Sequence, residues 1–228
     1  MTPAGIVNEA MKPKIQFALS LAAAALCAAL PIARRAAAHE YPLSSTAIRE
    51  AYFLGKESDA KRDEFFANYT QRSPMPKAGP HVSRIRLETP YAVVVERTAS
   101  QALANYVAGD AEEEFLGKPA VFRLRVRIDL TSTYPAQSAT EAGLRSRHED
   151  FWRDFRVRLR QHGEIAPTNV RGQPIYSIGS ELGGSMLLGA EVELEYDASK
   201  IQSAPATVEV DTPDGQLVRA EFNLAKLR

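Results

Sequence analysis

The group of neighbouring residues best suited to chemistry is His148-Glu149-Asp150. Imidazole and carboxylate groups can transfer protons in a hydrolase, and they can also bind a hard or borderline metal ion. Adjacent residues of a strand point to opposite faces, however, so His148 and Glu149 are poorly placed to share one ion. Their spacing matches no metal signature. We therefore expect no metal and no cofactor, and His148, Glu149 and Asp150 are the catalytic candidates of an alternative hypothesis, a secreted hydrolase.

Other enzyme motifs are missing from the sequence. Gly179-Ser180-Glu181-Leu182-Gly183 differs from the Gly-x-Ser-x-Gly elbow of serine hydrolases. Gly55-Lys56-Glu57 lacks the upstream glycine and the Ser or Thr of a phosphate-binding loop. These differences favour a protein that is not an enzyme.

A row of arginines lies in the stretch 121–130, where Arg123, Arg125 and Arg127 alternate with apolar residues. This period of two predicts a strand with one buried face and one solvent-facing face. The arginines could form a basic surface that binds carboxylates or phosphates. The main interpretation is that they face acidic side chains across the sheet, and exposed pairs of this kind contribute a median of about 0–1 kcal/mol each. The acidic residues with the same spacing are Glu191, Glu193 and Glu195.

Two further features are candidates for binding a ligand or partner. The glycine-rich stretch 179–188 reads as a loop that presents Met186 and Leu187, and loops at the ends of β-sandwiches often bind partners. The alternative is a long connection whose apolar residues pack into the core. Trp152, the only tryptophan, is either a ligand platform or a partly buried anchor of the sandwich.

The charge balance argues against nucleic acid as a partner. The chain has 28 basic and 28 acidic residues, and no aromatic residues interleave with the arginine row to stack bases. The only cysteine is Cys27. Removal of residues 1–38 would leave a chain without cysteine, which builds no disulfide framework, so its stability must come from a hydrophobic core.

Residues 1–38 have the features of a signal peptide. Lys12 and Lys14 precede the apolar, alanine-rich stretch 15–30, and Ala36-Ala37-Ala38 offers a small-x-small cleavage site. We expect the protein to be exported, to the periplasm or beyond the cell, with a mature chain that starts near His39.

The start and the fate of this leader have alternatives. Met11 stands directly before the basic pair and is a second candidate for the first residue. If the leader is not cleaved, residues 15–33 would anchor a structural subunit in the membrane, although an anchor needs about 20 apolar residues and Gln16 and Ser20 interrupt this stretch. We expect contact with a membrane only in that case.

Residues 39–80 are predicted to form a helical segment. Ser44-Ser45-Thr46 offers hydroxyl groups that cap a helix, and apolar residues recur at helical spacing up to Gly55. Asp59 caps a second helix that has an aromatic stripe. Prolines between residues 70 and 80 end this segment.

Residues 81–228 are predicted to form a β-sandwich-like domain. One helix, 101–115, interrupts the strands, and residues 131–146 are irregular. Thr212-Pro213-Asp214-Gly215 predicts the turn of a hairpin between the last two strands. The predicted strands are 82–88, 91–96, 121–130, 151–160, 174–178, 191–196, 207–211 and 216–224.

The fold class that these elements predict is mainly β, or α+β. It consists of antiparallel sandwich-like sheets, two short N-terminal helices and one helix inserted between strands. With an export signal, a competent core and no catalytic signature, we expect an exported, non-enzymatic module. It would bind an unknown protein or take part in an assembly of the cell envelope.

Overall fold

The computed structural model describes residues 41–101, 105–140, 143–177 and 185–228. Within them the chain has the predicted β-rich α+β fold, with two main antiparallel sheets and four α-helices. The helices are α2 (Ser45–Lys56), α3 (Asp59–Ala67), α4 (Pro90–Ser100) and α5 (Ala108–Phe115), with 3-10 turns η1 (Phe151–Asp154), η2 (Ala198–Lys200) and η3 (Leu224–Lys226). The strands are β1 (Thr70–Arg72), β2 (His81–Glu88), β3 (Val121–Asp129), β4 (Gln137–Thr140), β5 (Gly143–Ser146), β6 (Arg156–Arg160), β7 (Glu164–Ile165), β8 (Asn169–Tyr176), β9 (Leu187–Asp197), β10 (Pro205–Asp211) and β11 (Leu217–Asn223).

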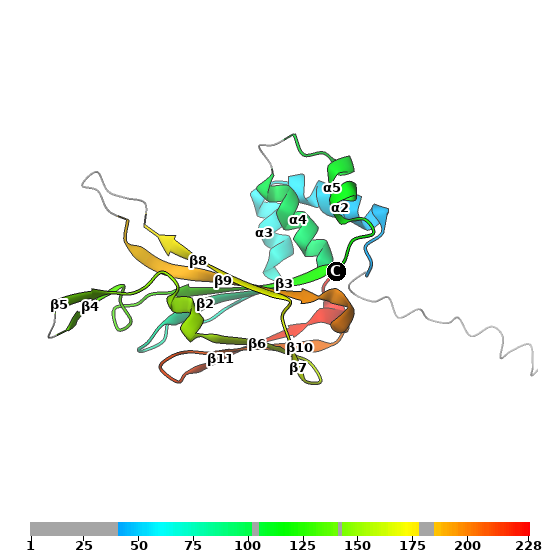
Figure 1. Ribbon diagram of the computed structural model, residues 1–228. Coiled ribbons are helices and arrows are strands. Elements are labelled where there is room, and N and C mark those ends of the chain that lie inside the picture. The colour runs from blue at the N-terminus through cyan, green and yellow to red at the C-terminus, as the bar shows by residue number, and fades with distance from the viewer. Residues whose placement is uncertain (1–40, 102–104, 141–142, 178–184) are drawn as a thin grey trace, which may run out of the picture. The chain divides into compact units, whose positions relative to one another are not determined.

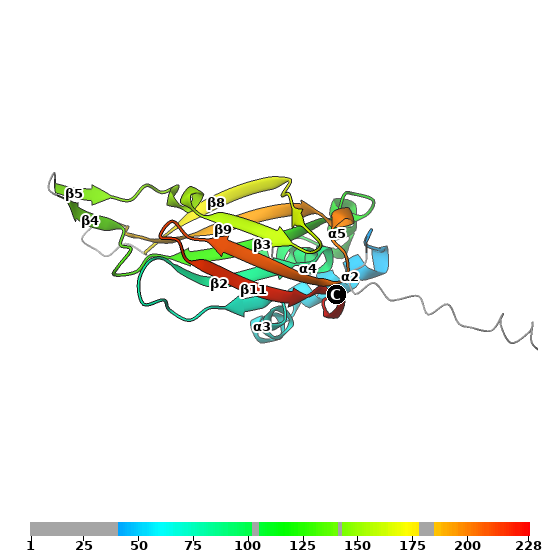
Figure 2. The same ribbon diagram turned by 90° about the horizontal axis from the view of Figure 1, so that it is seen from below.

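The strands form two layers. The five-stranded sheet has the order β1-β2-β3-β9-β8, and the four-stranded sheet has the order β11-β10-β6-β7. Seen from below, the strands of the two sheets run in nearly the same direction (Figure 2), as in an aligned β-sandwich. Strands β4 and β5 form a separate hairpin.

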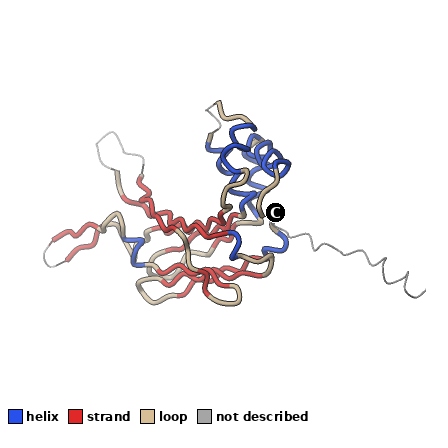
Figure 3. Tube along the Cα trace, turned by 45° about the vertical axis from the view of Figure 1, so that its right-hand side comes forward, coloured by secondary structure: helices blue, strands red, loops and turns tan. Residues whose placement is uncertain are grey.

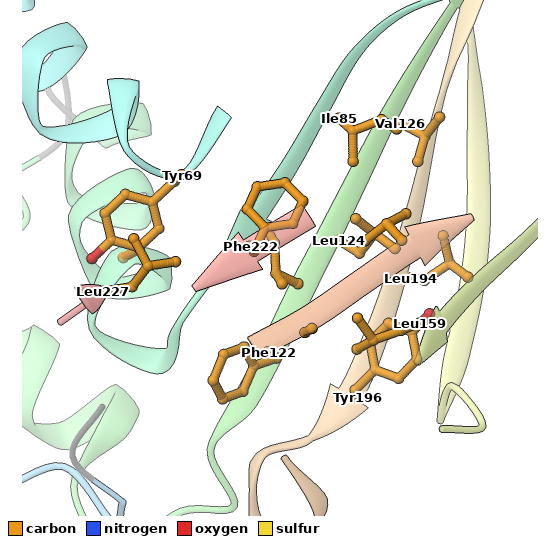
Figure 4. Close-up of a cluster of buried hydrophobic side chains, with 14 of the residues drawn as sticks. Tyr69, Ile85, Phe122, Leu124, Val126, Leu159, Leu194, Tyr196, Phe222 and Leu227 are labelled. Carbon is orange, nitrogen blue, oxygen red and sulfur yellow. The ribbon is translucent and has the colours of Figure 1, made fainter. Parts of the chain in front are cut away.

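The core lies between the two sheets and follows from the alternation of apolar residues. Phe122, Leu124, Val126 and Ile128 of β3 are fully buried, and they point toward the inner side chains of the facing sheet. Figure 4 shows this cluster, in which Leu159 of the four-stranded sheet lies beside inner side chains of the five-stranded sheet.

The helices pack together on the outer side of the five-stranded sheet, near one end of its strands (Figures 1 and 3). The predicted helix caps are confirmed in part. The side chain of Ser44 caps α2, whereas Asp59 is the first residue of α3 and Ser58 occupies its N-cap position.

The strand predicted at 91–96 is wrong, because these residues belong to helix α4. The Thr89 side chain accepts a hydrogen bond from the backbone N–H of Ala92, and Pro90 is the first residue of the helix, where its missing N–H costs nothing. Three consecutive valines favour a strand only weakly, and burial of the helix on several sides overrides that preference.

The helix predicted at 101–115 is also wrong in extent, and two helices separate β2 from β3 where one was expected. Gln101 ends α4, residues 102–104 lie outside the described residues, and α5 starts only at Ala108. The acidic stretch after residue 108 forms a helix of its own.

Several strand boundaries differ from the prediction. The strand predicted at 151–160 starts only at Arg156, because residues 151–154 form η1. The strand predicted at 174–178 corresponds to β8, which runs from residue 169 to residue 176, and residue 178 lies outside the described residues. Strands β4 and β5 occur in the stretch predicted to be irregular, and β1 occurs at the end of the segment predicted to be helical. Pairing with a neighbour stabilises all three. The hairpin between β10 and β11 is confirmed, and Gly215 in its turn has a φ of 85°.

The proposed leader, residues 1–38, lies outside the described residues, so its cleavage stays a prediction. In the part of the chain that the structure describes, none of the helices is long and apolar enough to cross a membrane.

Candidate functional site

The outer face of the five-stranded sheet has a continuous set of ion pairs, called the charged face below. Strands β3 and β9 pair in a register that places Arg123 opposite Glu195, Arg125 opposite Glu193 and Arg127 opposite Glu191. The predicted pairing with acidic side chains across the sheet is therefore confirmed for Arg123 and Arg125, which both form ion pairs with Glu193, whereas Arg127 pairs with Asp129 of its own strand. The charged face consists of Arg84, Arg86, Glu88, Arg123, Arg125, Arg127, Arg171, Glu191, Glu193 and Glu195.

Arg125 is the centre of this network. Its guanidinium group lies 3.1 Å from a carboxylate oxygen of Glu193 and 3.0 Å from one of Glu96 in helix α4. The side chains of Arg123 and Arg125 are only 16% and 18% exposed. The expectation of exposed pairs is thus wrong for these two arginines, because α4 lies over this part of the sheet, whereas the small contribution of each pair stays a prediction.

Glu88 is fully buried although its position in β2 faces outward. One oxygen lies 3.4 Å from Arg86 and 3.8 Å from Arg125, and the other lies 3.8 Å from Arg123. Burial raises the pKa of Glu88 to about 7 against the opposing charges of Arg125 and Arg86. The sequence signal that could have located this carboxyl is the Thr89-Pro90 helix start directly after it.

A groove between α4 and β8, called the α4 groove, opens beside this network and has a volume of about 360 Å³. Guanidinium and carboxylate groups alternate along it. Burial alone would raise the pKa of Glu193, but a hydrogen bond from Arg171 and the charges of Arg123 and Arg125 outweigh burial and lower it. Each arginine of β3 that lines this groove is thus already paired. Binding of an external anion by Arg123, Arg125 or Arg127 stays an untested hypothesis.

The hydrolase candidates lie elsewhere, beside η1. His148 and Asp150 line one open cleft of about 380 Å³, and Asp150 forms an exposed ion pair with Arg153 at 3.4 Å. Glu149 does not line this cleft, and its hydrogen bond with Tyr176 raises the pKa of that tyrosine. The structure therefore brings together two of the three candidates, and the hydrolase hypothesis stays a prediction.

Trp152 packs against strand β8. The indole ring lies directly against Gly172 of β8, so close that a methyl group at residue 172 would overlap it. This contact agrees with the interpretation of Trp152 as a partly buried anchor of the sandwich.

Met186 and Leu187 lie at the base of the β8–β9 hairpin. Leu187 and Leu188 belong to β9 and not to a loop, and Leu187 is partly buried against the core. The backbone N–H of Ser177 donates to the carbonyl oxygen of Met186 at 2.8 Å, which holds the two strands together. Residues 178–184 of the predicted loop lie outside the described residues.

Three apolar side chains at this place are exposed: Met186 by 58%, Leu188 by 38% and Tyr176 by 37%. We call the segments 175–177 and 185–188 the β8–β9 arm. It extends away from the end of the sheet that the helices cover (Figure 1).

Within the described residues, no group of three or more His, Cys, Asp or Glu side chains is arranged to hold a metal ion. The expectation of no metal and no cofactor stays a prediction. Comparison of the chain with protein-family models, with curated proteins and with solved structures finds no match. The function must therefore be argued from the geometry of the chain itself.

Proposed function

We propose that this protein is an exported, non-enzymatic module that binds a partner protein, or an assembly of the cell envelope, through its β8–β9 arm. The observation on which this proposal rests is the group of exposed apolar side chains Tyr176, Met186 and Leu188. Single exposed apolar residues are common on protein surfaces, but three of them close together at the end of two paired strands favour a contact site.

The neighbouring sheet edge supports a protein as the partner. Strand β8 is the last strand of the five-stranded sheet, and none of the described strands pairs with its outer edge. Backbone N–H and C=O groups along such an edge can pair with a strand of another protein. Pro174 lacks one of these donors, which limits unspecific pairing along β8.

Export is supported by the basic and apolar pattern of residues 12–30 and by the small residues at 36–38. We predict that the mature chain starts near His39. Intact-mass measurement of the protein from its native host tests this start. A chain that keeps Met11 and stays in membranes through salt and carbonate washes would instead support the anchored alternative.

The proposed contact predicts the result of site-specific photo-crosslinking in the native host. A photo-reactive amino acid in place of Met186 should give a discrete adduct with a partner, and the substitution Leu188→Asp should remove that adduct. The matched control position is Leu217 of the four-stranded sheet, which is 44% exposed. The absence of an adduct at Met186, or equal adducts at Met186 and Leu217, would contradict the proposal.

A further inference from the structure

A second groove lies on the other side of the charged face, between α3 and strands β1 and β2. We call it the α3 groove, and its volume is about 470 Å³. Arg72, Arg84 and Arg86 line it from the sheet, and Asp63 is its one acidic residue. It differs from the α4 groove, in which carboxylates and guanidinium groups alternate.

The strand register places like charges side by side at this groove. Arg72 of β1 is the partner of Arg84 of β2, and Arg84 is the partner of Arg127 of β3. Like charges directly opposite each other in a sheet are destabilising. A continuous row of three arginines therefore needs negative charge nearby.

Carboxylates compensate only part of this row. Arg84 lies 2.8 Å from Glu191, and Arg127 lies 2.8 Å from Asp129. The exposed guanidinium group of Arg72 forms no hydrogen bond or ion pair with any described residue. The end of the row at the α3 groove is thus a positive charge without a counter-ion from the described chain.

Arg86 is held in place beside Arg72 and Arg84. Its guanidinium group stacks on the ring of Phe66 at 4.1 Å and lies 3.4 Å from the hydroxyl oxygen of Thr70. Its carboxylate contacts, Glu88 at 3.4 Å and Glu96 at 3.5 Å, are long. Because burial raises the pKa of Glu88 to about 7, this carboxyl is only partly ionised near neutral pH and neutralises Arg86 incompletely.

We propose that the α3 groove binds a phosphoryl group through Arg72, Arg84 and Arg86. A phosphate monoester has three acceptor oxygens and between one and two negative charges near neutral pH, which suits several guanidinium groups better than a single carboxylate does. The groove is larger than one phosphate ion, so it has room for the molecule to which the phosphoryl group is attached. That molecule is a small phosphate ester or the headgroup of a phospholipid.

Calorimetric titration of the purified protein tests this site with three probes: glycerol 3-phosphate, inorganic phosphate and succinate. We expect glycerol 3-phosphate to bind, its affinity to fall as salt rises, and succinate to bind at least ten-fold more weakly. Sedimentation with phosphatidylglycerol vesicles, compared with phosphatidylcholine vesicles, distinguishes a lipid headgroup from a free ester. Binding in either arm supports the phosphoryl site.

The informative variant is Arg72→Gln, because this exposed side chain has no partner among the described residues and its loss should not disturb folding. We expect this substitution to weaken binding of glycerol 3-phosphate about ten-fold or more. Arg72→Lys should weaken it less, since lysine keeps the positive charge but lacks the planar guanidinium group. The matched control is Arg156→Gln, an arginine of the four-stranded sheet that is also exposed.

Three results would overturn the proposal. The first is that neither glycerol 3-phosphate nor either type of vesicle binds. The second is that succinate binds as tightly as glycerol 3-phosphate, and the third is that Arg72→Gln and Arg156→Gln lose the same amount of affinity. The last result would show unspecific attraction to positive charge. The β8–β9 arm takes no part in these measurements, so their outcome is independent of the proposed function.

Discussion

At the scale of single residues, the most informative side chain is Glu88. The alternation of β2 places it on the outer face with Arg84 and Arg86, where solvent was expected. Helix α4 starts two residues later and excludes water from the carboxyl, while three arginines lie within 4 Å. Desolvation outweighs their attraction, and the pKa of Glu88 is raised to about 7.

This raised pKa predicts how stability depends on pH. A carboxyl with a higher pKa in the folded state contributes stability below its unfolded pKa of 4.5, and this contribution is lost as pH rises through about 7. Glu88→Gln should remove that loss and make the protein more stable than wild type at pH 8, by up to about 3 kcal/mol. Urea unfolding at pH 5 and pH 8 measures the difference.

The control for this measurement is Glu57→Gln, since Glu57 forms a surface pair with Lys61. It should leave the slope between pH 5 and pH 8 unchanged. A Glu88→Gln protein that is less stable than wild type at pH 8 would show that the ionised carboxylate is needed by its arginine neighbours.

At the scale of secondary-structure elements, the contact between η1 and β8 sets one edge of the sandwich. Gly172 is the residue of β8 against which the indole of Trp152 lies. The ring covers the face of this edge strand at Gly172. Glycine is required at this position by the approach of the ring.

We predict that Gly172→Ala destabilises the protein by about 1–3 kcal/mol, because the added methyl group overlaps Trp152. Most of that cost should disappear in a Trp152→Ala background, which a double-mutant cycle of unfolding free energies measures. Gly163→Ala is the control, since nothing lies within 4 Å of a methyl group there. Additive effects of the two substitutions would refute the overlap.

At the scale of the whole described molecule, the charged face joins helix α4 to the five-stranded sheet. Arg125 contacts the sheet through Glu193 and helix α4 through Glu96. A half-buried ion pair keeps its strength in salt better than an exposed one, and removal of one partner leaves the other charges facing each other. The same face thus combines a structural role with two open grooves.

Two arginine substitutions separate buried from exposed pairs. Arg125→Gln should lower the free energy of unfolding by about 2 kcal/mol, because Glu88, Glu96 and Glu193 lose a shared partner. Arg171→Gln should cost less than about 1 kcal/mol, since this side chain is 52% exposed. Denaturant unfolding at low and high salt measures both. Equal costs would mean that α4 does not shield the network.

The sequence by itself determined the β-rich fold, the hairpin at 212–215 and the pairing of the arginine row with acidic residues. Each of these follows from local information, namely a period of two, a turn motif and matched charge spacing. A period of two shows which side chains share a face of a strand. It does not show what covers that face.

Only the tertiary structure decided what covers each face. The apolar run 91–95 became part of a helix through the Thr89 cap and through burial, and that helix excludes water from Glu88. The short strand β1, which no pattern predicted, is stabilised by pairing with β2 and brings Arg72 beside Arg84. The Thr89 cap is local, but the burial of the helix and the pairing of β1 with β2 depend on contacts between residues distant in sequence, which local periodicity does not contain.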